Sequence, residues 1–205
     1  MLRGGTARGG PGAASSSGQV PLVDRPLPRG KGEVALSLFA FLFSEMVQYA
    51  QKRSSNIGEL EGKLEAIGMH AGYRLLELLT HRDKGNKRET RILGVLSFIH
   101  TPVWKCLFGK PADSLEQGND AEDEYMISDH GLLVNRFISV PKDMGSLNCG
   151  AYVAGIVKGV LEASGFPARV TAHFVGLGDG TGAQKTVILI KFAEAVLERE
   201  RRMGA

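Results

Sequence analysis

The chain has 205 residues, of which 43% are hydrophobic and 23% are charged. This length suffices for one domain with a sizeable core, and only marginally for two small ones. The formal net charge is +3, but residues 1–32 hold five basic residues and one acidic residue, which leaves −1 for residues 33–205. A nearly neutral folded part lacks the basic surface that binds phosphates, so we expect no nucleic-acid partner.

The two cysteines and the apolar runs indicate a soluble intracellular protein. Cys106 and Cys149 cannot form a disulfide framework and give no CxxC metal pair. The longest apolar run, at 34–43, is much shorter than the roughly 18 to 20 residues that span a bilayer. Residues 1–32 are rich in Gly, Pro and Ser, and we interpret them as a disordered basic tail before a single domain at 33–205; a transit peptide is the alternative.

Apolar periodicity predicts three helices in the first half of the chain, over residues 34–53, 56–81 and 89–108, the last of them broken at Pro102. Asn56 and Glu59 have the spacing of a capping box at the start of the second helix. The first helix is apolar nearly all round. A helix of this kind must be covered on more than one side, by its own domain and by another protein.

The second half of the chain is predicted to contain an acidic loop at 111–124, a hairpin of strands 125–128 and 132–140, a helix at 148–163, strands at 170–175 and 187–192, and a helix at 193–202. Helices and strands come in runs and do not alternate singly. We therefore expect an α+β fold with helices packed on one antiparallel sheet of about four strands. Ala151, Gly155 and Gly159 form a smooth stripe, which favours close packing of their helix on the sheet.

The glycine-rich segment 176–182 invites comparison with a phosphate-binding loop. That loop requires Gly directly before Lys and a helix directly after it. Here Gln184 precedes Lys185 and a predicted strand follows, so we interpret the segment as a hairpin connection. A small-molecule-binding protein or enzyme that uses this loop stays as the alternative function.

The histidines and cysteines form no local catalytic or metal-binding motif. The five histidines lack the spacing of a metal site, although a spatial triad that includes His130 or His173 stays open. We interpret both cysteines as small buried hydrophobes. The alternatives are acylation of Cys106 and, for Cys149 at the start of a helix, a pKa lowered by the helix dipole. We expect no catalytic residue, no cofactor and no metal ion.

Seven segments in order along the chain carry a resemblance to a known family: Leu36–Glu45, Lys87–Gly94, Val103–Lys110, Leu115–Asp120, Asn135–Lys142 (NRFISVPK), Leu147–Leu161 (LNCGAYVAGIVKGVL) and Gly165–His173 (GFPARVTAH). Together they closely resemble the small core subunits of the transport protein particle (TRAPP), in the subunit-five branch. The likeness covers about residues 33–200. The tail and the loop 176–184, which is longer than the usual connection, depart from the family pattern.

The resemblance implies a noncatalytic core subunit that pairs with a sister TRAPP subunit. It implies a place in the tethering complex of ER-to-Golgi vesicle transport, which promotes nucleotide exchange on a Rab GTPase through a surface built mainly from other subunits. It also implies a cytoplasmic protein, peripheral at the cis-Golgi and endoplasmic reticulum through the complex alone. A related branch carries an acylated cysteine, but neither Cys106 nor Cys149 matches that position.

The first two helices offer the predicted pairing surface, because their apolar residues exceed what one side of a sheet covers. The residues that we assign to this surface are Phe39, Phe43, Leu64 and Ile67.

Overall fold

A computed structural model describes residues 34–82, 88–118, 122–140, 144–145, 147–177 and 184–204. The predicted tail at 1–32 and most of the glycine-rich segment lie outside the described residues. Residues Val34–Ala205 cluster as one compact unit.

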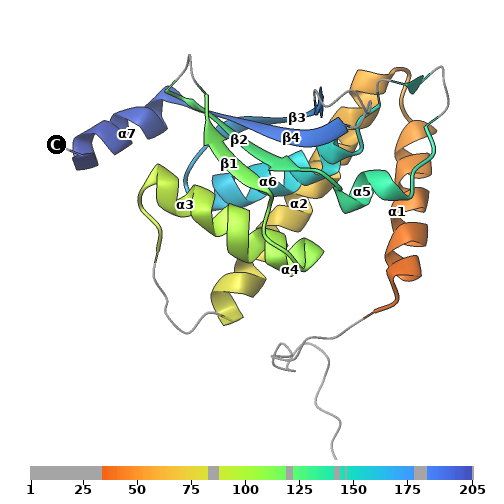
Figure 1. Ribbon diagram of the computed structural model, residues 1–205, viewed down its shortest axis with the longest axis horizontal. Helices are drawn as coiled ribbons and strands as arrows, with labels where there is room; N and C mark the ends of the chain where they lie inside the picture. The colour runs from red at the N-terminus through yellow and green to blue at the C-terminus, as the bar shows by residue number, and fades with distance from the viewer. Residues whose placement is uncertain are drawn as a thin grey trace, which may run out of the picture. The chain divides into compact units, whose positions relative to one another are not determined.

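The sheet has four antiparallel strands in the order β1-β2-β4-β3 (Figure 1). They are β1 (Ser114–Gln117), β2 (Glu124–Asp129), β3 (Ala168–Gly176) and β4 (Gln184–Phe192). One cross-strand row joins Ile127, Ile188 and Ala172 and faces the helix α6 (Gly150–Ala163). The predicted α+β class, with helices on one antiparallel sheet of four strands, is confirmed.

One predicted strand is wrong, and another was missed. Residues 132–140 form a short helix, α5 (Leu133–Arg136), and an irregular segment, because the chain turns away from the sheet after β2. The turn is stabilised by the Asp129 carboxylate, which accepts a 2.9 Å hydrogen bond from the Gly131 amide. The missing strand is β1, inside the predicted acidic loop, where Leu115 pairs with Ile127.

The predicted helices are largely confirmed: α1 (Leu36–Gln51), α2 (Ile57–Arg82), α3 (Ile92–Phe98) with α4 (Trp104–Phe108), α6 and α7 (Glu194–Gly204). Asn56 caps α2 by accepting a 2.8 Å hydrogen bond from the Glu59 amide, as its spacing predicts. The break predicted at Pro102 takes the form of a π-helical turn, Ile99–Val103, because proline cannot donate its main-chain hydrogen bond. Gly109, with a φ of 77°, ends α4.

Glycines bring α2 and α6 into main-chain contact. Figure 1 shows α6 between the sheet and α2. A Cβ atom at Gly155 would overlap the main-chain oxygen of Glu65, and one at Gly159 would overlap that of Met69. The prediction that this stripe packs on the sheet is therefore wrong. It faces α2, and the sheet is met by other residues of the same helix.

Candidate partner interface

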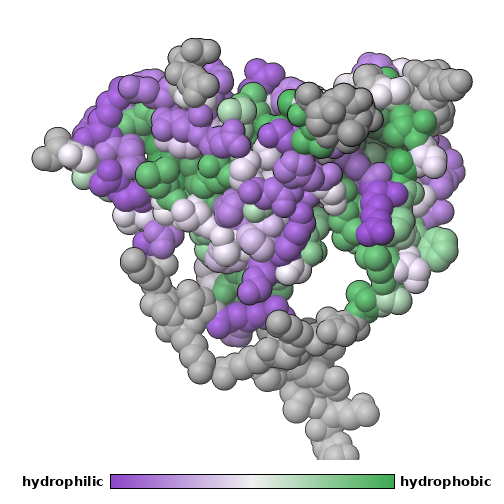
Figure 2. Space-filling model, viewed as in Figure 1, coloured by the Kyte–Doolittle hydropathy of each residue, from purple (hydrophilic) through white to green (hydrophobic). Residues whose placement is uncertain are grey.

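The helix α1 carries a row of exposed apolar side chains, which we call the α1 stripe: Leu38, Phe41, Leu42 and Tyr49, exposed by 58%, 74%, 60% and 56%. Their spacing of three, four and seven residues places them on one face of the helix. Figure 2 shows hydrophobic residues along α1 at the right of the view. Several neighbouring large apolar side chains in the open are typical of a protein interaction site.

The opposite face of α1 is packed against the body of the domain. Phe43, Val47 and Ala50 are buried. The Phe43 ring lies 5.7 Å from the Phe39 ring and 5.4 Å from the Tyr152 ring of α6, centroid to centroid. The contact between Phe43 and Tyr152 fixes the helix on the domain, so the α1 stripe lies on an anchored element.

The four residues predicted for the pairing surface fall into two groups. Phe43 and Leu64 lie in the hydrophobic core, where they are 2% and 0% exposed, so their side chains have almost no surface to offer a partner. Phe39 and Ile67 are partly exposed. The exposed residues of the α1 stripe were not among those predicted, because a helix that is apolar all round carries no periodic signal for its outer face.

The first turn of α1 also borders an apolar groove of about 310 Å³. Val34, Leu36 and Phe39 form one wall, and residues of α4, α5 and α6 form the other. The lining contains no charged residue, so the groove suits apolar side chains.

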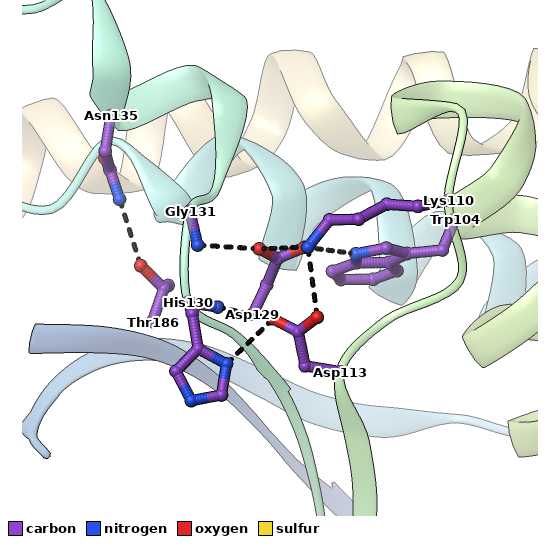
Figure 3. Close-up of polar contacts among 8 residues, drawn as sticks. All are labelled: Trp104, Lys110, Asp113, Asp129, His130, Gly131, Asn135 and Thr186. Carbon is purple, nitrogen blue, oxygen red and sulfur yellow. Dashed lines mark hydrogen bonds and ion pairs between the residues drawn. The ribbon is translucent and has the colours of Figure 1, made fainter.

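The polar residues gather elsewhere, at the turn after β2 (Figure 3). Asp129 is 2% exposed and accepts hydrogen bonds from the Trp104 indole nitrogen at 2.9 Å and from the Gly131 amide at 2.9 Å. Lys110 lies 3.2 Å from the same carboxylate. These bonds satisfy a buried charge and join α4 to the sheet.

Asp113 completes this cluster beside β1. Its carboxylate accepts hydrogen bonds from the main-chain amide of His130 at 2.7 Å and from Lys110 at 3.1 Å, and it lies 2.9 Å from Nδ1 of His130. Burial opposes its ionisation, but these bonds outweigh burial and lower the pKa of Asp113 to about 2. The cluster is a structural brace for the hairpin of β1 and β2.

Among the described residues, neither His130 nor His173 forms the catalytic triad that the sequence left open. His130 binds Asp113, and Nε2 of His173 lies 2.8 Å from the Thr171 hydroxyl, so neither histidine is joined to a serine or a cysteine. Within the same described part, no three His, Cys, Asp or Glu side chains could share a metal ion.

The two cysteines differ in exposure. Cys149 is buried, and burial together with the charge of Glu61 raises its pKa to about 11. The interpretation of Cys149 as a small buried hydrophobe is therefore confirmed, and activation of its thiol by the helix dipole is not, because desolvation dominates. The same interpretation is wrong for Cys106, which is exposed. Of the glycine-rich loop, positions 178–183 lie outside the described residues.

The sequence comparison places this helix-on-sheet domain in a known family. Residues 39–193 match the family model of the transport protein particle (TRAPP) component. The chain belongs to this family. A relative from Dictyostelium discoideum named trafficking protein particle complex subunit 5 is 60% identical over 90% of this chain and 98% of its own length. The human protein of the same name is 46% identical over 93% of this chain and 97% of its own length.

These high-identity relatives identify the subunit-five branch that the seven sequence segments predict. A more distant relative, trafficking protein particle complex subunit 31 of Saccharomyces cerevisiae, is 30% identical over 82% of this chain and 79% of its own length. The crystal structure of a subunit 3 from Naegleria fowleri, covalently bound to palmitic acid, shares the fold with a TM-score of 0.62 at 21% identity, over 78% of this chain and 95% of that one. Among the described residues, no helix is both long and apolar enough to cross a membrane.

Proposed function

We propose that this chain is a noncatalytic core subunit of a TRAPP tethering complex and pairs with a sister subunit through the α1 stripe. The observation that supports the proposal is the exposure of Leu38, Phe41 and Leu42 on a helix whose other face is anchored in the core. Full burial of a Leu or Phe side chain contributes about 1.5 to 3 kcal/mol. Several such side chains together suffice for a central cluster of binding residues.

In this proposal the chain acts as a scaffold in ER-to-Golgi vesicle transport, peripheral at the cis-Golgi and endoplasmic reticulum through the complex. Nucleotide exchange on a Rab GTPase belongs to surfaces of other subunits, and the chain contributes to it by holding the assembly together. Its polar cluster supports a structural role, because the Asp113 and Asp129 carboxylates are engaged in hydrogen bonds within the fold.

The test is coexpression with tagged sister subunits, followed by size-exclusion chromatography and native mass spectrometry. We expect Phe41→Asp to weaken pairing by about 2 kcal/mol or more, because a charge would replace a buried aromatic side chain in the interface. Changing Phe43 would be uninformative, since that side chain belongs to the core.

The matched control is Leu93→Asp. It changes an apolar side chain that is also well exposed, at 62%, but lies on α3. The proposal expects this variant to pair like the wild type. Equal recovery of sister subunits by Phe41→Asp and the wild type, with both variants folded, would remove the α1 stripe as the interface.

A further inference from the structure

The strand β3 leaves one side of the sheet without a partner in the described part of the chain. It lies at the end of the strand order, and its main chain pairs with β4 only. Its nine residues include no proline, and Phe174 and Val175 are exposed. Long, unprotected edges of this kind are avoided in natural proteins unless another element covers them.

A groove of about 390 Å³ runs along this edge. Five consecutive residues, Val170 to Phe174, line one wall. Successive side chains of a strand point to opposite faces of its sheet, so a wall of consecutive residues follows the strand's edge. The opposite wall is one face of α2, formed by Gly58, Glu61, Gly62 and Glu65.

Small residues keep this groove open. Ala151 and Ala154 of α6 line it as well. On the α2 wall, a Cβ atom at Gly62 would have no heavy atom within 4 Å. A groove between an edge strand and a helix, with this clearance, has the shape that receives an extended peptide as an additional strand.

The charged residues that line the groove determine which peptide sequences it favours. Glu65 is paired with Lys158 at 2.8 Å. Glu61 accepts a 2.8 Å hydrogen bond from the Asn148 amide, and within the described residues no cation pairs with it. A net negative wall favours basic side chains opposite α2 and disfavours a terminal carboxylate.

We propose that β3 and α2 form a second docking site, which binds an extended, basic, internal segment of a partner protein as a fifth strand. Main-chain hydrogen bonds to the β3 edge supply the affinity, and Glu61 supplies the preference for a basic side chain. The lined length corresponds to a segment of about five residues. This site is separate in sequence and in lining residues from the α1 stripe.

The chain offers a matched pair of variants for this proposal. Gly62→Trp fills the groove with a large side chain, and Gly62→Ala leaves it open. Both changes fall on an exposed position of α2 with free space around it, so both variants should fold. Fluorescence of the buried Trp104 and near-ultraviolet circular dichroism would compare the folded states of wild type and Gly62→Ala. Unfolding curves would compare the stability of all three proteins, Gly62→Trp included.

The probe is a displayed library of peptides about ten residues long, twice the lined length, flanked on both sides by linker and selected on the full chain. We expect basic, β-forming peptides that bind wild type and Gly62→Ala alike and bind Gly62→Trp at least tenfold more weakly. Bound peptide should slow amide exchange in residues 168–176. Affinity should fall as salt is raised, as for any contact between opposite charges.

Selected peptides that bind Gly62→Trp and Gly62→Ala equally would overturn the proposal, as would a library that yields no binder or only helical or acidic ones. The assignment of the α1 stripe as the sister-subunit interface is tested independently of the groove. Gly62→Trp should still copurify with sister subunits, and Phe41→Asp should still bind the selected peptides.

Discussion

The indole nitrogen of Trp104 donates a 2.9 Å hydrogen bond to Oδ2 of Asp129, and both residues are almost completely buried. The bond joins the start of α4 to the end of β2, where the chain leaves the sheet. It therefore couples an aromatic side chain of the core to a carboxylate that also stabilises the following turn.

We predict that Asp129→Ala destabilises the domain by about 3 kcal/mol, because the Trp104 and Gly131 donors lose their buried acceptor. Asp129→Asn keeps an acceptor oxygen and should therefore lower the free energy of unfolding less than Asp129→Ala does. Urea unfolding followed by the fluorescence of Trp104, the single tryptophan, measures both. Equal stability of wild type and Asp129→Ala would show that the brace contributes nothing.

Substitution by alanine should have opposite effects on stability at Gly155 of α6 and at Gly62 of α2. We predict that Gly155→Ala costs about 3 kcal/mol, because its Cβ atom would overlap the main-chain oxygen of Glu65 and force α2 and α6 apart. Gly62→Ala should instead stabilise the domain by up to about 1 kcal/mol, since Ala has the higher helix propensity and the space is open. Thermal unfolding measures both, and similar melting temperatures for the two variants would contradict the close contact.

The acid stability of the domain should depend on Asp113. Its folded-state pKa of about 2 lies below the ordinary 3.8, so its hydrogen bonds stabilise the fold above pH 4 and lose this effect as the pH falls toward 2. After allowance for solvent screening, the contribution is roughly 1 kcal/mol.

The measurement is the difference in unfolding free energy between wild type and Asp113→Asn at several values of pH. We expect wild type to be the more stable at pH 7 and the difference to shrink as the pH falls from about 4 toward 2. A difference that stays constant over this interval would mean that the Asp113 charge has no part in stability.

Local patterns predicted the elements whose apolar residues are regularly spaced. The helix α6 and the strand β4 follow their patterns closely, because each is buried by neighbours on more than one side. The strand β1 was not predicted, because Leu115 is its one apolar residue and gives no alternating pattern. Its extended conformation depends on the pairing with β2. At 132–140 the apolar residues are strand-like, but the Asp129 turn decides the path of the chain.

The candidate interface shows the same limit at the level of single residues. Apolar character all round α1 indicated a helix that needs cover on two sides, yet it gave no means to separate Phe43 from Phe41, which are 2% and 74% exposed. That choice depends on Tyr152, which is distant in sequence and packs on Phe43. The groove beside β3 likewise joins segments that no local pattern relates.

The two thiols should differ sharply in reactivity. Burial, with the charge of Glu61 as a smaller cause, raises the pKa of Cys149 to about 11, so almost none of it is thiolate near pH 8 and reagents cannot reach it. Cys106 is exposed and should react with a thiol reagent as soon as it is added. We expect Cys106→Ser to abolish the fast phase of labelling and Cys149→Ser to leave it unchanged. In urea both thiols of the wild type should react at once, whereas fast labelling of Cys149 in the folded chain would contradict its place in the core.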